Sequence, residues 1–221
     1  MKQYGLLLGM AMLLTACGGD KTAQAPSDAP KASEQMAQQA AQNTAVHRES
    51  APVAQQPDKA VLTEEAKAAV QAFSGALKGE LESAIKTGGP VEALKVCNTK
   101  APEITKTVSS EKGLQISRVS LKNRNPSNAP NDWQTDVLKQ FETRKAGGED
   151  MANMAYAEVV GNEFRFMKAI PTGTLCLNCH GTQISPAITA KLGELYPQDK
   201  ATGFQEGDLR GAFVVVKNLA Q

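Results

Sequence analysis

The pentapeptide Cys176-Leu177-Asn178-Cys179-His180 constrains this chain of 221 residues more than any other segment. The pattern C-x-x-C-H is typical of the covalent attachment of a c-type haem. Each cysteine thiol adds across one vinyl group of the porphyrin, and the two-residue spacer lets both sulfurs reach adjacent edges of one ring. The histidine that follows is placed to bind the iron. The motif therefore predicts one covalently attached haem c, with Cys176 and Cys179 as attachment sites and His180 as an axial ligand.

Other interpretations of these cysteines compete with haem attachment. Three thiolates and one imidazole would suit a tetrahedral zinc ion, and the candidates are Cys97, Cys176, Cys179 and His180. Structural zinc sites commonly use two closely spaced pairs, however, and Cys97 stands alone in the sequence. A structural disulfide is a further alternative, whereas a thioredoxin-like pair would need a surrounding βαβ pattern that is absent. A structural lipoprotein stapled by zinc or a disulfide therefore stays open beside the haem protein.

Residues 1–16 have the features of an export signal. Lys2 gives a positive start, and residues 6–14 form an apolar run that is too short to span a bilayer as a helix. The run ends in Leu14-Thr15-Ala16-Cys17, which resembles a bacterial lipobox; an ordinary signal peptide that contains a cysteine is the alternative. A lipobox predicts cleavage before Cys17 and lipidation of Cys17. We therefore expect the protein on the periplasmic side of a bacterial membrane, the outer membrane included, where c-type haem is attached.

The chain after the signal divides into a tether and one domain. Residues 17–60 are rich in Ala, Gln, Pro and Ser and contain no aromatic residue, so they are expected to form a lipidated, disordered tether with a solvated His47. Residues 61–221 suit a single haem-binding domain. The chain has 24 Lys and Arg against 23 Asp and Glu, without a basic stripe, which argues against nucleic-acid binding. The expected partners are the membrane, through the lipid, and a redox or signalling protein that the sequence does not identify.

Hydrophobic periodicity predicts helices at the start of the domain. Thr63 is expected to cap a helix whose apolar residues recur at spacings of three and four: Val70, Phe73, Leu77, Leu81 and Ile85. The sequence Gly88-Gly89-Pro90 should end this helix. A second helix is expected from Pro90 toward Lys100, with Pro102 interrupting or restarting it.

Alternating patterns predict strands in the rest of the domain. Strands are expected at residues 113–121, 154–160, 163–170 and 209–216, with helices at 133–144 and 185–195. Gly161-Asn162 is a hairpin signal between the second and third strands. Helices followed by antiparallel strands form an α+β pattern, in which the N-terminal helices pack on an antiparallel sheet. The haem motif would follow a hairpin, unlike its position near the start of a small helical cytochrome c.

The second axial ligand must come from elsewhere in the chain. His180 is the only histidine of the predicted domain, and the remaining candidates are Met151, Met154, Met167, a lysine, Cys97 or water. Methionine is the common partner in electron-transfer cytochromes, but Met154 and Met167 also suit ordinary core positions. Cys97 has no predicted partner, which is unusual in an oxidising compartment, although buried inert thiols are common.

Polar residues after the first predicted strand are candidates for contacts with the haem edge. Haem propionates are anionic, and a buried carboxylate needs charge-assisted donors. Arg118 and Arg124, with Asn125 and Asn128, would supply such donors. The alternative is a set of surface arginines beside a turn ordered by proline.

Four segments together resemble a family of bacterial and cyanobacterial haem proteins. The family is known as a domain of unknown function and has one covalent c-type haem in a PAS-like fold. The matching segments are residues 93–104, 117–133, 176–181 and 201–213, the last without residue 205. The resemblance implies a PAS-like α+β fold, with histidine and cysteine as the two axial ligands, here His180 and Cys97. A thiolate opposite histidine favours Fe(III), so the reduction potential should lie below that of a His/Met cytochrome.

Several functions follow from a haem with two protein ligands. The first is a monohaem c-type cytochrome that acts as an electron-transfer or redox protein. The second is a redox or CO/NO sensor that works through a partner, because this chain shows no output domain. An enzyme such as a peroxidase would need an open iron face and distal acid–base groups, and the predicted domain has no distal histidine. We therefore expect no enzymatic activity.

Overall fold

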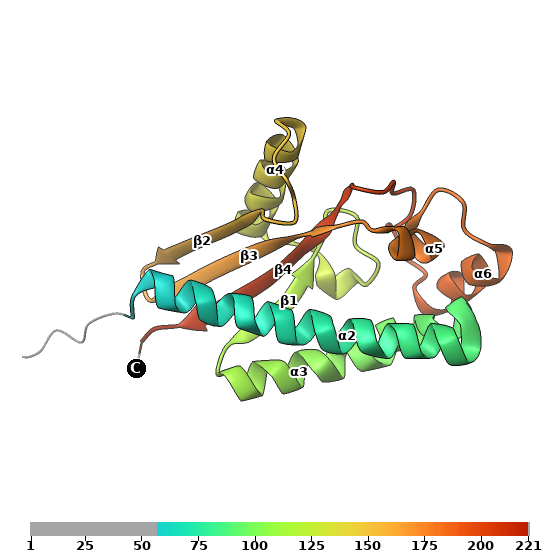
Figure 1. Cartoon of the computed structure of the whole chain (residues 1–221), viewed down its shortest axis with the longest axis horizontal. Coiled ribbons are helices and arrows are strands. Elements are labelled where there is room, and N and C mark those ends of the chain that lie inside the picture. Colours follow the sequence, from blue (N-terminus) through green and yellow to red (C-terminus); the bar gives the residue numbers. More distant parts are fainter. Residues whose placement is uncertain (1–56, 221) are drawn as a thin grey trace, which may run out of the picture. The chain divides into compact units, whose positions relative to one another are not determined.

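The computed structural model describes residues 57–220. The predicted signal peptide, the predicted lipidation site Cys17 and the predicted solvated His47 lie outside the described residues. The described chain is α+β, as predicted, with helices and a four-stranded antiparallel sheet (Figure 1). Its elements are α2 (Lys59–Lys95), a π-helical turn (Val96–Lys100), α3 (Ala101–Lys112), β1 (Gln115–Val119), a 3-10 turn (Pro126–Asn128), α4 (Asp132–Ala146), β2 (Ala155–Val160), β3 (Glu163–Pro171), a 3-10 turn (Thr174–Cys176), α5 (Leu177–His180), α6 (Pro186–Leu195) and β4 (Leu209–Asn218).

Helix α2 begins earlier than predicted. Its N-cap is Asp58, whose Oδ1 accepts the Ala60 amide at 2.8 Å. The prediction that Thr63 caps the helix is wrong, because Thr63 lies inside α2 and its hydroxyl donates to the Lys59 carbonyl at 2.7 Å. Asp is a better cap than Thr, and the earlier start places Leu62, which is 1% exposed, in the core. The last residues of the predicted tether, Lys59 and Ala60, thus belong to the helix.

The predicted break at Gly88-Gly89-Pro90 takes the form of a kink inside α2. Gly89 has φ 76° and ψ −179°, a backbone conformation essentially confined to glycine. The chain continues as a helix to Lys95, passes through the π-helical turn that carries Cys97, and returns to α geometry in α3. Pro102 lies in the first turn of α3, where a missing amide proton breaks no helical hydrogen bond. The predicted restart near Pro102 is therefore confirmed.

The sheet has the order β1-β4-β3-β2, and all neighbouring strands are antiparallel. The last strand of the chain, β4, lies between β1 and β3, with Ile116 opposite Val215 and Phe166 opposite the same valine. The predicted hairpin joins β2 and β3 at Gly161, which has φ 59°. This order brings the end of β1 and the beginning of β4 together at one edge of the molecule.

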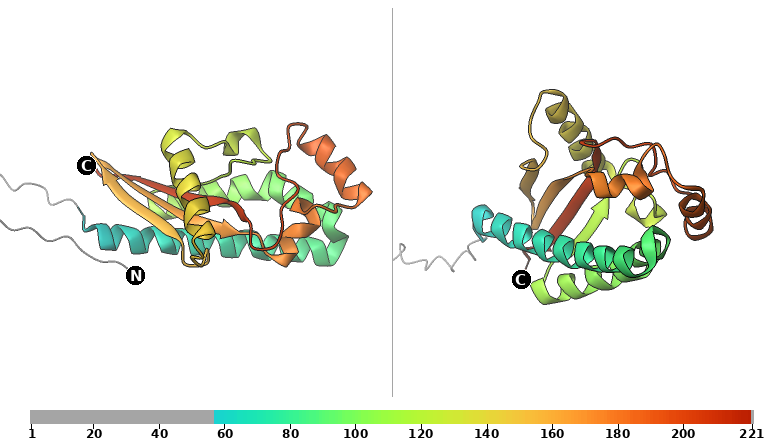
Figure 2. Two further views of the ribbon diagram at one scale, coloured as in Figure 1. Left: turned by 90° about the horizontal axis from the view of Figure 1, so that it is seen from above. Right: turned by 45° about the vertical axis from the view of Figure 1, so that its right-hand side comes forward.

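The two faces of the sheet are covered by different helices (Figures 1 and 2). Helices α2 and α3 lie side by side over one face, where Phe73 of α2 packs in a cluster with Phe164, Phe166 and Val215 of the strands. Helix α4 covers part of the opposite face through a second cluster that contains Val137, Leu138, Phe141, Met154 and Met167. A capping box between Asn131 and Gln134 fixes the start of α4. Each face of the sheet therefore has its own apolar core.

A third, smaller cluster holds α6 against the part of α2 beyond the kink. It contains Leu94, Ile188, Leu192 and Tyr196, with Cys179 packed against it. Helices α5 and α6 accordingly gather at the end of α2 that is distant from the chain's C-terminus (Figure 1). Among residues 57–220, no helix combines the length and apolar character that a bilayer crossing requires.

Candidate functional site

The pentapeptide forms a short helical segment that ends at Gly181. The 3-10 turn ending at Cys176 leads directly into α5, and the Gly181 amide donates to the Leu177 carbonyl at 2.9 Å. A Cβ atom at Gly181 would lie 2.6 Å from that carbonyl oxygen, so only glycine fits. Cys176 and Cys179 are half-buried free thiols, and their spacing of three residues in helical backbone turns both toward one side.

The imidazole of His180 is held by one backbone carbonyl. Its Nδ1 lies 2.6 Å from the Ala201 carbonyl oxygen, and because a carbonyl only accepts, Nδ1 carries the proton and Nε2 keeps its lone pair. Burial, followed by repulsion from the nearby cations Arg210 and Arg124, lowers the pKa of His180 to about 2. His180 is therefore a neutral imidazole with Nε2 free, which is the form that binds a metal.

The loop after α6 is bound to the pentapeptide through its backbone. The amides of Gly203 and Phe204 donate to the carbonyls of Gly181 and His180, both at 2.9 Å. The Phe204 ring meets the imidazole edge-on, with centroids 6.2 Å apart and planes at 90°. This loop therefore fixes both the backbone and the ring of His180. Sequence analysis assigned no role to Phe204, although it lies in a segment that supports the family resemblance.

Arg124 is buried and already has partners. Its Nε lies 3.0 Å from Oδ2 of Asp199, and its Nη2 donates to the carbonyls of Cys179 at 2.5 Å and Ala201 at 3.2 Å. The predicted neighbour Asn125 is exposed, and its side-chain oxygen accepts the Ser127 amide at 3.0 Å. The structure thus brings Arg124 to the pentapeptide through carbonyl contacts, while Asn125 caps the 3-10 turn that follows it.

Arg118 and Arg210 differ from Arg124 because, within residues 57–220, neither forms an ion pair with a carboxylate. Arg118 of β1 lies over the Phe73 ring at 5.3 Å, and burial lowers its pKa. Arg210 of β4 donates to Ser120 Oγ at 3.1 Å and lies over the Phe204 ring at 5.2 Å. Burial lowers the pKa of Arg210 to about 10, and repulsion from the other arginines adds to the effect. The site therefore holds two half-buried cations that form no ion pair with a carboxylate of the described residues.

The sequence predicts a haem-edge role for Arg118 but not for Arg210. The only sequence signal for Arg210 is its place in the last of the four family segments, because its position between Leu209 and Gly211 has no distinguishing pattern. The antiparallel pairing of β1 with β4, which puts Arg118 opposite Phe213, brings the two arginines to one end of the sheet.

Cys97 reaches this region from the helical hairpin. It is a half-buried free thiol on the π-helical turn between α2 and α3. It lies close enough to Arg118 to favour the charged guanidinium and raise the pKa of Arg118, against the larger effect of burial. It also adds, after burial, to the raised pKa values of Cys179 and Tyr196. The structure thus brings Cys97 into the neighbourhood of Cys179, although the two lie far apart in the sequence.

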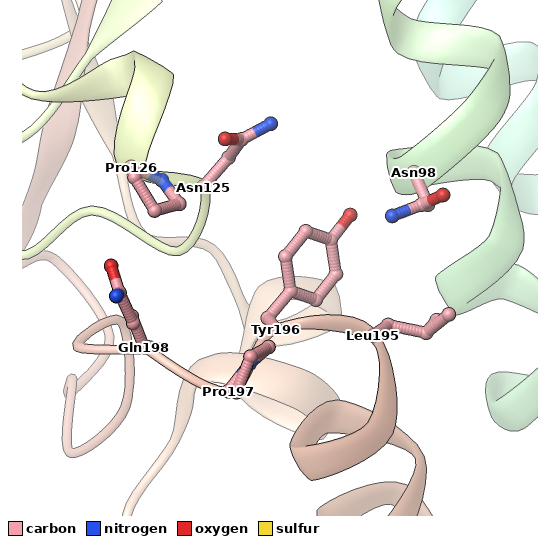
Figure 3. A pocket seen from close by; sticks show the side chains of 7 residues that line it. All are labelled: Asn98, Asn125, Pro126, Leu195, Tyr196, Pro197 and Gln198. Atoms are coloured by element: carbon pink, nitrogen blue, oxygen red, sulfur yellow. The ribbon is translucent and has the colours of Figure 1, made fainter.

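A cavity of about 240 Å³ opens beside the site. Tyr196 lies in its centre, with Asn125 on one side and Asn98 of the π-helical turn on the other (Figure 3). Burial raises the pKa of Tyr196, and Arg124 and Arg118 oppose this rise. The cavity therefore connects the turn that carries Cys97 with the loop that follows Arg124. Tyr196 was not assigned by sequence analysis and has no sequence signal beyond an apolar helix end.

The structure separates the methionine candidates from His180. Met151, Met154 and Met167 all belong to the apolar cluster beneath α4, whereas Cys179 packs in the cluster at the end of α2. In the described part of the chain, no three His, Cys, Asp or Glu side chains gather closely enough to hold a metal ion. The four candidate zinc ligands are thus not assembled as a tetrahedral site in this arrangement.

The fold and the site define an α+β protein with a C-x-x-C-H motif held at the end of a helical hairpin. The family model described as Tll0287-like matches residues 23–217, and the chain belongs to the Tll0287-like family. This confirms the resemblance noted in the sequence.

A solved structure has the same fold, namely the "Crystal structure of the cyanobacterial heme-protein Tll0287". The TM-score is 0.56 at 24% identity, and the match covers 72% of this chain and 95% of that chain. A comparison with curated proteins found no match.

Proposed function

We propose that this protein carries one c-type haem, attached through Cys176 and Cys179, with His180 and Cys97 as the axial ligands. The geometry of His180 carries the proposal, because its Nδ1–H···O bond of 2.6 Å to Ala201 leaves Nε2 free in a neutral ring. The half-buried free thiols next to it are the second support. The third support is the solved structure with the same fold, whose title names a haem protein.

Arg118 and Arg210 are the residues that we assign to the two haem propionates. Both arginines are half-buried without an ion-pair partner in the described residues. Desolvation lowers the pKa of each, and a charge-assisted contact with a carboxylate would offset that cost. Arg124, which sequence analysis placed in this role, already pairs with Asp199. Asn125 remains a candidate at the haem edge, since it lines the cavity next to Tyr196.

One-electron transfer is the function that such a site supports best. A haem held here would supply Fe(III)/Fe(II) chemistry, and protein ligands on both sides would leave no iron position open to a substrate. We therefore propose a redox protein and not an enzyme. Charge donation by the Cys97 thiolate would place its reduction potential below that of a His/Met cytochrome.

The cellular setting belongs to the same proposal. Lipid on Cys17 would anchor the protein to the periplasmic side of a bacterial membrane, and residues 17–60 would tether the haem domain to it. A redox protein at the same membrane would be the partner. We also infer a PAS-like fold, supported by two helices over one face of an antiparallel sheet and a site at the end of those helices.

Sensing is a second candidate function, and the π-helical turn at Val96–Lys100 favours it. Single π-helical turns inside α-helices occur often at functional sites. In a sensor, a return of this turn to α geometry would withdraw Cys97 from the iron when the redox state changes or when CO or NO binds. Rapid binding of CO by the reduced protein would favour sensing over plain electron transfer.

The spectrum of the exported protein tests the proposal. The alkaline pyridine spectrum of the wild type should show the α band of a c-type haem, and low-spin thiolate signals should appear in electron paramagnetic resonance. Cys97→Ala should abolish the thiolate signals and keep the covalent haem. Asn98→Ala on the same turn is the matched control and should keep both. A wild type without the α band, or with thiolate signals that survive Cys97→Ala, would contradict the proposal.

A further inference from the structure

The carbonyl oxygen of Ala201 accepts hydrogen bonds from two side chains of the site. Nδ1 of His180 lies 2.6 Å from it, and Nη2 of Arg124 lies 3.2 Å from it. A carbonyl oxygen has two lone pairs, so both donors can be satisfied together. The second donor nevertheless draws electron density from the oxygen and makes it a weaker acceptor for the imidazole N–H.

Asp199 holds Arg124 and Ala201 in place at the same time. Its Oδ2 lies 3.0 Å from Nε of Arg124, and its Oδ1 accepts the Ala201 amide at 2.7 Å. The side chains of Arg124 and Asp199 are only 7% and 11% exposed. Arg124 also donates to the Cys179 carbonyl at 2.5 Å, next to His180 in the chain. The contacts therefore form a closed ring that includes the acceptor of the histidine and the backbone before it.

We propose that the Arg124–Asp199 pair is the positioning device of His180. It fixes the carbonyl that receives the imidazole N–H, and it thereby sets the rotation of the ring and the basicity of Nε2. The proposal rests on the proposed function, in which Nε2 binds the haem iron. Outer partners of a ligating histidine commonly control its orientation and basicity in this way.

Arg124→Lys and Asp199→Asn test this role in the full-length, haem-loaded protein. Lysine keeps the charge but cannot contact Asp199 and two carbonyls through one planar group. Asparagine keeps an acceptor for the Ala201 amide but loses the charge pair. In both variants we expect the haem content to stay at the wild-type level, the low-spin resonance signals to shift or split, and the reduction potential to change.

Helix α4 offers a matched control pair. Arg144 binds Glu149 through Nε at 2.8 Å and Nη2 at 2.5 Å, and its Nη1 donates to the Ala155 carbonyl at 3.0 Å. This arginine also joins a carboxylate to a backbone carbonyl, but it lies with α4, which packs on the other sheet face from α2. Arg144→Lys and Glu149→Gln should leave the resonance signals and the potential unchanged.

The outcomes separate the two proposals. Unchanged resonance signals and potential in both Arg124→Lys and Asp199→Asn would overturn the positioning role. Loss of helical circular dichroism in both variants would also overturn it, because the pair would then serve the fold as a whole. A wild type without covalent haem would defeat the proposed function, which is read from the wild-type pyridine spectrum before any variant is compared.

Discussion

His180 and Ala201 are 21 residues apart in the chain, and a hydrogen bond of 2.6 Å joins the ring of one to the carbonyl of the other. The bond assigns the proton to Nδ1 and leaves Nε2 unprotonated. Burial and the surrounding arginines lower the pKa of His180 to about 2, so the ring stays neutral in the folded chain. The binding atom of the proposed iron ligand is therefore prepared before any haem is attached.

We expect His180 to stay neutral in the haem-free double variant Cys176→Ser/Cys179→Ser. The ring should remain uncharged from above the ordinary histidine pKa of about 6.5 down to the pH of acid unfolding. Nitrogen NMR should show an Nδ1–H tautomer for His180 that persists over this range. A His180 resonance that titrates near pH ~6.5 would contradict the assignment.

The same shift predicts the effect of acid on stability. The unfolded chain takes up a proton on this histidine near pH 6.5, as an ordinary histidine does at roughly that value, while the folded chain does not. The free energy of unfolding of the haem-free variant should therefore decrease as the pH falls below about 6.5, by up to about 1.4 kcal/mol per pH unit from this group. The pH dependence of the free energy of unfolding, measured with urea, should become flatter when His180→Gln is added. It should not change with His47→Gln.

Arg210→Gln should have opposite effects with and without haem. In the haem-free chain it removes a half-buried cation that repels Arg118 and Arg124, and it also loses the bonds to Ser120 and the Lys122 carbonyl. We expect a net gain in the free energy of unfolding on the order of 1 kcal/mol. In the haem-loaded protein it removes the proposed partner of a propionate, so the free energy of unfolding should decrease. It also removes a positive charge that favours Fe(II), so the reduction potential should fall. Equal effects on both forms, measured by urea unfolding, would contradict a propionate-binding role.

The sequence allowed most elements to be predicted because their signals are local. The hairpin at Gly161-Asn162, the helix predicted at residues 133–144 and the break at Gly88-Gly89-Pro90 each depend on residues close together in the chain. Trp133 of that helix is half-buried and packs against the cluster beneath α4, with its ring stacked on Tyr156. The insertion of β4 between β1 and β3 depends on pairing over long distances, which no local pattern encodes.

The candidate site shows the same division. The role of the pentapeptide could be predicted directly from the sequence, but the residues that surround it in the fold could not. Arg118 and Arg124 looked equivalent in sequence, but the loop that carries Asp199 pairs with Arg124 alone. Arg210 and Tyr196 enter the site only because β4 and α6 fold back against β1 and α2, respectively. Charge compensation is a property of the folded chain, so residue type and spacing were insufficient to distinguish the arginines.

Gly211→Ala should destabilise the protein through the backbone of β4. Gly211 has φ 152°, and a Cβ atom there would lie 2.3 Å from the Val119 carbonyl oxygen of β1. We expect a loss of about 2–3 kcal/mol in the free energy of unfolding, because either the strand pairing or the bulge opposite Pro171 must shift. Gly75→Ala in α2 is the control, since a Cβ there meets nothing within 4 Å. It should stabilise by roughly 0.5–1 kcal/mol. Equal effects of the two substitutions in urea unfolding would contradict the close approach.

Tyr156 should ionise later than an ordinary tyrosine. Its hydroxyl donates to the Glu158 carboxylate, and burial, followed by this bond, raises its pKa to about 12. Because the unfolded chain releases the same proton near pH 10, as tyrosine does at about that value, the stabilising contribution is complete below about pH 10 and is lost as the pH rises toward 12. Tyr156→Phe should remove the late step from the ultraviolet phenolate titration and flatten the alkaline loss of stability. Glu158→Gln, which keeps the buried ring but removes the charge, should move the step toward lower pH. A late step that survives Tyr156→Phe would assign it instead to Tyr196, whose pKa burial also raises.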